Sequence, residues 1–304
     1  MGTPLVSVIL LTYNHEKYIR QCLKSVISQK TIFNFEVIIG EDCSKDNTLD
    51  ICKEFKQQYP ELIVLLLRKK NLGLGRNLID TLSYAKGQYI AFQEGDDYWT
   101  DDLKLQKQVD ILLKNEEIIA VTHNSNEIGN NHKILINNPK QIYSLKETSK
   151  GRLFHTNSWM IRKEFIVDFE FYYDNLICWD ILMELKIFEK GKVYFINEIL
   201  SVWRRHEDGN SMKIPLRIQY IHFENLYKRL LNEAKNLNDS FLIRHYKLTL
   251  SNFYSIFALE IAKRDKVLHI KAILNSIFYQ ILNKTKNKYF LLRLAKTYFK
   301  ANFS

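Results

Sequence analysis

The chain has 304 residues, of which 46% are hydrophobic and 13% aromatic, so it can close a sizeable core and does not have the composition of a disordered protein. No apolar stretch of about 18 residues without charges occurs, which predicts no membrane-spanning helix. The apolar start at residues 5–11 lacks a basic flank and a cleavage site, so it is interpreted as a strand rather than a signal peptide. Disulfides and structural zinc are not expected, because the cysteines form no C-x-x-C pair and have no histidine at zinc spacing: Cys22, Cys43, Cys52 and Cys178.

The formal net charge of +10 is unevenly distributed along the sequence. From Ser211 onward there are 17 Lys and Arg against five Asp and Glu, a balance of +12, whereas residues 1–210 carry 27 against 29, a balance of −2. We expect these two parts of the chain to meet different partners.

The first hundred residues alternate apolar runs with segments whose apolar residues recur at helical spacing. The runs predict strands at residues 6–11, 37–39, 63–67 and 89–92. The spacing predicts helices near residues 18–27, 46–58 and 75–85, the second capped by Asp46. Continuous apolar strands separated by amphipathic helices favour a mostly parallel sheet covered on both faces. Such sheets bind ligands outside the carboxyl ends of their strands.

Beyond residue 101 the predicted pattern is mixed. We expect helices at about 101–114 and 177–188, and strands near 118–122, 133–136, 158–161, 193–196 and 200–203. Apolar residues within 253–261 and 270–278 recur at helical spacing, which predicts a bundle of amphipathic helices that buries most of its apolar surface.

An acidic cluster, Glu94-Gly95-Asp96-Asp97, follows the strand predicted at 89–92. Three carboxylates in four residues repel one another unless a cation lies among them, and Gly95 allows the backbone to turn tightly. Carboxylate oxygens suit Mg²⁺ or Mn²⁺, which keep open positions for substrate phosphates. A solvated loop that caps the following helix is the alternative interpretation.

A second acidic segment, from Glu41 to Asp46, follows the strand predicted at 37–39. A carboxylate at this strand end, such as Asp42, can accept the N3–H of uracil or thymine, whereas cytosine N3 has no hydrogen to donate. Tyr13, at the end of the neighbouring strand, can stack on such a base.

Four segments together resemble the ordered donor-site motifs of the inverting family 2 glycosyltransferases, which have the GT-A fold. They are the opening Val6-Ser7-Val8-Ile9-Leu10-Leu11-Thr12-Tyr13-Asn14, the stretch from Glu36 to Asp46, Gly73-x-Gly75-Arg76-Asn77, and the stretch from Gly87 to Asp97. The resemblance implies a GT-A, Rossmann-like catalytic domain over residues 1–212, with a donor half at about 1–100 and an acceptor half at about 101–212. A basic helical region follows at 213–304.

The resemblance also implies roles for individual residues. It implies that the nucleotide is contacted by Leu11, Tyr13, Asp42, Arg76 and Asp96. It also implies that an Mn²⁺ or Mg²⁺ ion is bound by Asp97, Asp96 and His206. Asp180, at the start of a helix that ends before a Gly and a strand, matches the catalytic base. A helix first-turn carboxylate is the alternative for Asp180, and a surface loop histidine is the alternative for His206. The resemblance also places further residues next to these positions in the site: Glu41, Glu94, Asn77, Trp179 and Arg204. It places His155, Asn157 and Ser158 on the acceptor side.

These residues imply a metal-dependent enzyme that transfers a hexosyl or N-acetylhexosaminyl group from a UDP-sugar to a glycan or lipid-linked acceptor, with inversion. A role in cell-surface polysaccharide or glycolipid synthesis in the cytoplasm is expected. Nucleotidyl transfer is disfavoured because the first turn, from Thr12 to Glu16, is not a Gly-rich basic phosphate loop. A basic nucleic-acid- or nucleotide-binding protein without transferase activity is the other alternative, but no nucleic-acid motif occurs and we expect no nucleic-acid partner.

The basic end of the chain has two interpretations. It is either a helical cap on the catalytic domain or a face that rests on the anionic inner surface of the cell membrane. The second rests on basic residues interleaved with aromatic and aliphatic ones: Lys284, Lys286, Lys288, Arg293, Lys296 and Lys300.

Overall fold

The computed structural model describes residues 2–129, 133–134, 136–137, 139–170, 172, 179–207, 209, 214–261 and 266–282. The chain divides into two compact units, one formed by Met1–Leu145 and Phe154–Lys213 and the other by Lys146–Leu153 and Ile214–Ser304. We call them the sheet unit and the helical unit. Within the described ranges, no helix has both the length and the apolar character needed to span a bilayer. The basic set between Lys284 and Lys300 lies outside the described residues.

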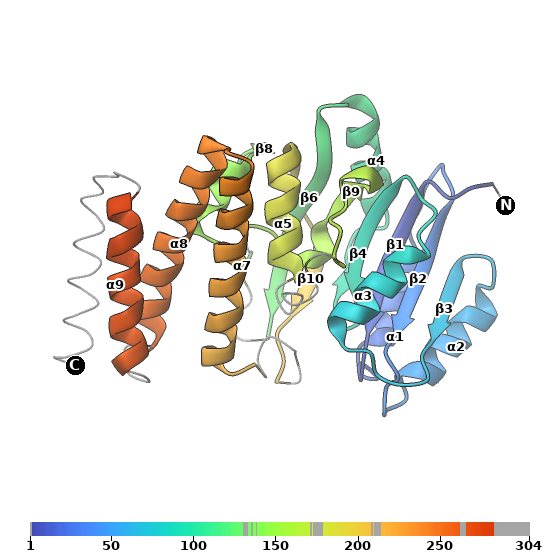
Figure 1. Ribbon diagram of the computed structural model, residues 1–304. Coiled ribbons are helices and arrows are strands. Elements are labelled where there is room, and N and C mark those ends of the chain that lie inside the picture. The colour runs from blue at the N-terminus through green and yellow to red at the C-terminus, as the bar shows by residue number, and fades with distance from the viewer. Residues whose placement is uncertain are drawn as a thin grey trace. The chain divides into compact units, whose positions relative to one another are not determined.

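The sheet unit is built on a mixed, mostly parallel sheet with strand order β3-β2-β1-β4-β9-β6-β10-β5 (Figure 1). Its first four strands are parallel and have these bounds: β1 Val6–Thr12, β2 Phe35–Glu41, β3 Ile63–Leu67 and β4 Tyr89–Glu94. All seven residues of β1 are buried, because both of its edges are paired and both of its faces are covered. The parallel arrangement expected from the continuous apolar runs is confirmed.

Three helices connect these strands: α1 Ile19–Ile27, α2 Thr48–Gln58 and α3 Leu74–Ser83. The buried residues of α1 are Ile19, Cys22, Leu23 and Val26, the spacing of a single apolar face. The N-cap position of α2 falls on Asn47, one residue after the expected Asp46, but the Asn47 side chain makes no capping hydrogen bond. The Asp46 carboxylate instead accepts hydrogen bonds from the backbone N–H of Thr48 (3.0 Å) and of Glu16 (3.1 Å), which ties α2 to the loop after β1.

The second half of the sheet mixes parallel and antiparallel pairs. Its elements are β5 Tyr98–Trp99, α4 Lys104–Lys114, β6 Ile118–Ile128, β7 Lys133–Ile134, β8 Ile142–Tyr143, β9 Met160–Arg162, α5 Trp179–Lys190 and β10 Lys192–Arg204, with the short 3₁₀ turns η1 Leu145–Lys150, η2 Thr156–Ser158 and η3 Lys163–Phe165. The strands expected at 193–196 and 200–203 are one strand, β10, whose register against β6 shifts on both sides of Ile199. The strand expected at 158–161 is shorter, because η2 occupies its start.

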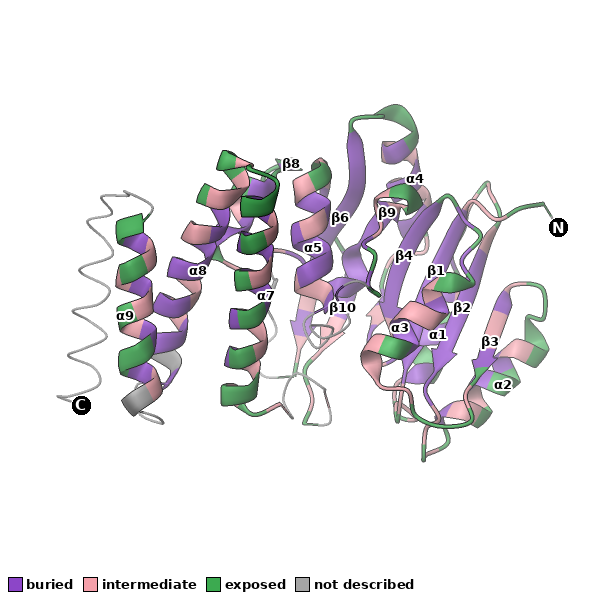
Figure 2. Ribbon diagram, in the orientation of Figure 1, coloured by how far each residue is buried: buried purple, intermediate pink, exposed green. Residues whose placement is uncertain are grey.

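The helical unit contains α7 Leu216–Asn236, α8 Ser240–Ile261 and α9 Lys266–Leu282. Aromatic contacts join them, including Tyr220 with Phe257 (ring centroids 4.5 Å) and Tyr254 with Tyr279 (5.8 Å). The expectation that this bundle buries most of its apolar surface is wrong for α9. Its large apolar side chains lie mostly on the exposed face, which Figure 2 shows as repeated green segments: Ile270, Leu274, Phe278, Ile281 and Leu282.

Candidate functional site

The loops that follow β1 and β2 are tied to each other. Asn14 and Cys43 both have positive φ angles, 55° and 59°, which turn the chain sharply at the two strand ends. The Asn14 side-chain oxygen accepts a hydrogen bond from the Lys45 backbone N–H (2.8 Å), and the Asn14 N–H donates to Ser44 Oγ (2.9 Å). The two loops therefore form one polar edge at the carboxyl ends of the strands.

The acidic turn after β4 lies against the end of β1. A Cβ atom added to Gly95 would lie 2.4 Å from Thr12 Oγ1 and 2.8 Å from His15 Nδ1, so only glycine fits there. Its φ is not positive, so space rather than a special backbone conformation requires this glycine. The close approach brings Glu94, Asp96 and Asp97 to the same edge as the loops after β1 and β2.

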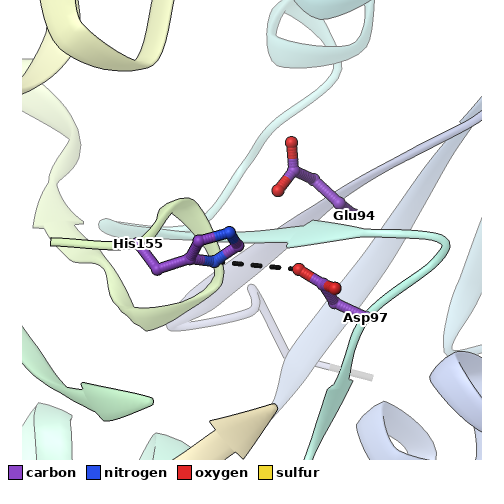
Figure 3. A group of neighbouring side chains, drawn as sticks. All are labelled: Glu94, Asp97 and His155. Atoms are coloured by element: carbon purple, nitrogen blue, oxygen red, sulfur yellow. Dashed lines mark ion pairs between the residues drawn. The ribbon is translucent and has the colours of Figure 1, made fainter. Parts of the chain in front are cut away.

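Asp97 is held from two elements of the fold, β10 and η2. Its side chain is only 1% exposed and accepts hydrogen bonds from the Arg204 backbone N–H (2.8 Å) and from Asn157 Nδ2 (3.1 Å), while His155 Nδ1 lies 3.7 Å away. Glu94, Asp97 and His155 each offer a ligand atom within 4.8 Å of the others (Figure 3). Burial, together with the charges of Asp96 and Glu94, raises the pKa of Asp97 well above its usual value.

Asp96 faces two histidines on the more open side of the cluster. Its Oδ2 lies 3.1 Å from His206 Nε2 and 3.7 Å from His15 Nε2, and the side chain is 19% exposed. Burial acts to raise the pKa of Asp96, but the two imidazoles outweigh it and the pKa lies below its usual value. Among the described residues, the buried Nδ1 of His206 has no hydrogen-bond partner.

Arg204, at the end of β10, fixes the backbone of the acidic turn. Its guanidinium donates to the carbonyl oxygen of Asp96 and to the side-chain oxygen of Gln21, and it lies over the rings of Tyr98 (4.5 Å) and Tyr18 (5.1 Å). Because the same residue also donates its backbone N–H to the Asp97 carboxylate, β10 supports both the backbone of the turn and one of its carboxylates.

The donor set of this cluster fits a divalent cation. Three carboxylates and three histidines offer oxygen and nitrogen ligands, and a cation relieves the like-charge repulsion that, in addition to burial, raises the pKa of Asp97. The unpartnered His206 Nδ1 shows that this ring is not fully satisfied by the protein groups around it. A bound cation would in turn hold an anionic group such as a diphosphate.

Similarity to known proteins identifies the family of this chain. The family model "Glycosyl transferase family 2" matches residues 7–170. The uncharacterized protein Rv1520 of Mycobacterium tuberculosis is 33% identical over 208 residues, 67% of this chain and 60% of that protein. The chondroitin synthase of Pasteurella multocida is 31% identical over 220 residues, 69% of this chain and 22% of the synthase. A crystal structure of residues 1–349 of TarS from S. aureus, in complex with UDP-GlcNAc, superposes with a TM-score of 0.60 at 18% identity, covering 92% of this chain and 90% of that one.

The chain belongs to glycosyl transferase family 2. The family match covers more than half of its length, and the superposition on TarS shows that it shares the GT-A-like fold. The chain spans about 60% of the length of curated relatives such as Rv1520.

Two residues that the family resemblance assigns to the nucleotide have protein partners in this structure. The Asp42 carboxylate, 3% exposed, accepts hydrogen bonds from the backbone N–H groups of Leu72 (2.7 Å) and Gly73 (2.9 Å), and burial raises its pKa. The Arg76 side chain is 45% exposed and pairs with Glu170 at 2.7 and 3.0 Å. Asp42 directly follows β2, and Arg76 lies in the first turn of α3.

The other predicted residues differ in exposure. Leu11 is buried in β1, and Tyr13 is half-buried just beyond it. Asn77 is buried and donates to the Gly40 carbonyl (2.7 Å), so its side chain packs α3 against β2. The buried Glu41 accepts from the Ser44 N–H (2.8 Å), which supports the loop after β2.

The first turn of α5 carries the expected base. Trp179 is buried and its ring contacts Phe92 of β4 (5.4 Å) and Phe169 (6.0 Å). Asp180 is half-buried, and its carboxylate accepts from the Ile181 N–H (2.9 Å). The Trp179 contact holds this turn beside the end of β4, where the acidic cluster begins.

Sequence reasoning put His155 and Asn157 on the acceptor side, but both contact Asp97 in the structure. Asn157 also donates to the Val202 carbonyl (3.2 Å) and accepts from Ser201 Oγ (2.8 Å), so it connects η2, β10 and the acidic turn. A single buried histidine between an apolar residue and a short strand gives no pattern in the sequence from which this contact can be read.

Proposed function

We propose that this chain transfers a hexosyl or N-acetylhexosaminyl group from a UDP-sugar to an acceptor hydroxyl, with inversion at the anomeric carbon. The observation that carries the proposal is the crowding of Glu94, Asp96 and Asp97 beside His155 and His206 at the carboxyl ends of a family 2 sheet. The fold match to a TarS structure that contains UDP-GlcNAc supports a nucleotide-sugar donor.

In this proposal the donor half, residues 1–100, binds the nucleotide. Leu11 and Tyr13 contact the uracil ring, and Asp42 accepts its N3–H. Asp42 can do so without releasing Leu72 and Gly73, because each carboxylate oxygen has a second lone pair. Arg76 exchanges Glu170 for the diphosphate, which carries the greater negative charge.

Mg²⁺ or Mn²⁺ would be held on the open side of the cluster by Asp96 and His206, which already face each other at 3.1 Å. Asp97 supports this site from its buried side. It is 1% exposed, and its two oxygens accept hydrogen bonds from the Arg204 backbone N–H and from Asn157 Nδ2. The bound cation would offset the negative charge of the diphosphate as it leaves.

Asp180 acts as the general base in the acceptor half, residues 101–212. Its carboxylate takes the proton of the acceptor hydroxyl as that oxygen forms a bond to the anomeric carbon and the bond to the diphosphate breaks. One carboxylate suffices, because no covalent sugar intermediate forms. The single displacement inverts the anomeric configuration.

We further propose a glycan or lipid-linked acceptor and a role in the synthesis of a surface polysaccharide or glycolipid, carried out in the cytoplasm or at the inner face of the membrane. The relative named a chondroitin synthase supports a glycan acceptor, because chondroitin is itself a glycan chain. The charge of +12 from Ser211 onward supports contact with an anionic surface.

A panel of UDP-, dTDP-, CDP- and GDP-sugars tests the proposal with the purified chain. At about 100 times its dissociation constant, the correct donor should stabilise the fold by about 2.7 kcal/mol, which is visible as a rise in melting temperature. The same donor should be slowly hydrolysed in the presence of Mn²⁺. A panel in which no nucleotide sugar stabilises the protein or is consumed would contradict the proposed function.

A further inference from the structure

Helix α9 has its polar and apolar faces reversed relative to a helix that faces water. Its nearly buried side chains include His269, Ser276 and Gln280. Its large apolar side chains are exposed by more than half: Ile270 57%, Leu274 60%, Phe278 54% and Ile281 71%. These four are three or four residues apart, so they share one face of the helix.

The polar face of α9 is used in packing against α8. Ser276 Oγ lies 2.6 Å from Ser255 Oγ and donates to the Ser251 carbonyl at 2.9 Å. The His269 ring lies 2.8 Å from the Ala258 carbonyl. These short side chains let the two helices approach closely and satisfy each other's polar groups. The orientation of α9 is therefore fixed by these contacts, and its most exposed apolar side chains point away from α8.

Among the described side chains of α9, the exposed face is an apolar strip, which Leu282 extends (44% exposed) and beside which Lys271 is exposed. Isolated exposed apolar residues are ordinary, but a strip of five on one helix is typical of a surface that another phase or molecule covers.

The charge of the surrounding sequence selects the partner. From Lys266 to the end of the chain there are eight Lys and Arg and no Asp or Glu. A second copy of the chain carries the same excess of positive charge, which opposes self-association. An anionic bilayer surface offers both acyl chains for the apolar strip and negative headgroups for the basic residues.

We propose that α9 binds the surface of an anionic lipid bilayer, with Ile270, Leu274, Phe278 and Ile281 inserted at the headgroup boundary. This contact is independent of the sugar-transfer site and needs no donor or acceptor. It would confine the chain to the membrane surface, where lipid-linked molecules are concentrated.

Sedimentation with vesicles tests this proposal on the full chain. The native protein should sediment with phosphatidylglycerol vesicles at low salt, but neither with pure phosphatidylcholine vesicles nor at high salt. The variant Leu274→Gln/Phe278→Gln should bind the anionic vesicles at least about tenfold more weakly, because the inserted apolar surface is lost. A matched control, Ile218→Gln/Ile221→Gln, changes two side chains of α7 that are each 41% exposed and should bind as the native protein does.

Circular dichroism and light scattering complete the experiment. Both variants should keep the native helical signal, since the substituted side chains are exposed. The proposal is overturned if the native protein stays in the supernatant with anionic vesicles, or if the α9 variant binds them as tightly as the native protein. It is also overturned if the native protein is a dimer that the α9 variant disrupts, because a second copy would then occupy the strip.

Discussion

Both units of this protein bury acidic side chains, but they surround them differently. In the helical unit, Glu224 accepts hydrogen bonds from the Tyr254 hydroxyl (2.7 Å) and from Lys228 (3.0 Å). Burial acts to raise the pKa of Glu224, but these two donors outweigh it and the pKa lies below its usual value. In the sheet unit, Asp97 is buried beside Asp96 and Glu94, and its pKa is raised well above the usual value.

The difference separates a structural carboxylate from a functional one. A buried acid whose charge is matched by donors holds a fold together, and removing it leaves those donors unpaired. A cluster of like charges opposes folding and is retained only where something outside the chain neutralises it. The predictions below test whether the two carboxylate environments differ in this way.

The largest expected effect is on turnover and comes from Asp180, outside the crowded cluster. Asp180→Asn keeps the shape but cannot take the acceptor proton, so turnover should fall by about 100-fold or more while UDP affinity stays unchanged. Glu189→Gln, on the same helix, is the matched control and should be fully active. NMR of the product made by the native protein should show an inverted anomeric centre; a retained configuration would rule out the single displacement.

The next effect concerns the base that the donor site recognises. Asp42→Asn should weaken UDP binding by about 1.5 to 3 kcal/mol, because a charged acceptor for N3–H is lost. Calorimetry measures this directly, and equal affinity of the native protein for UDP and CDP would refute the role of Asp42.

In the helical unit the expected effect is on stability alone. Glu224→Gln should lower the free energy of unfolding by about 1 to 3 kcal/mol, since the hydrogen bonds to Tyr254 and Lys228 lose their charged acceptor. Glu54→Gln, which breaks an exposed pair with Arg20, should leave the free energy of unfolding almost unchanged, because solvent screens the pair. Urea denaturation compares the two, and a change in UDP affinity caused by Glu224→Gln would argue against a purely structural role.

The last expected effect is on how the stability of the fold changes with pH. Burial lowers the pKa of His245 to about 4, whereas the unfolded chain takes up this proton near pH 6.5. The contribution of neutral His245 to the stability of the fold is therefore fully present above about pH 6.5. It is lost progressively as the pH falls toward 4. His245→Gln should reduce the loss of stability between pH 7 and pH 5 by about 2 kcal/mol. Identical pH profiles for the two proteins would contradict this.

The sheet and the acidic motif could be predicted because their signals are local. β1, β2 and β4 are continuous apolar runs that end in polar residues, and Glu94, Asp96 and Asp97 follow β4 within a few positions. The two-residue strands β5 and β8 are too short to leave a pattern. The register shifts that join two predicted strands into β10 depend on its partner β6, which the sequence of β10 does not encode.

Contacts between distant segments could not be predicted. His155 reaches Asp97 only because η2 packs beside β10, as the bonds of Asn157 show. For α9, the helical spacing predicted an apolar face but not which side of the helix the neighbour covers. Ser276 and His269 decide that by bonding to α8.

Calorimetric titration of UDP, with Mn²⁺ and with chelator, tests most directly whether the crowded carboxylates form a cation and diphosphate site. The native protein should bind UDP only with Mn²⁺. Asp96→Asn should weaken that binding at least about tenfold. Asp50→Asn, an exposed carboxylate on α2, should bind as the native protein does. Equal UDP affinity in chelator, or native affinity in Asp96→Asn, would contradict the account.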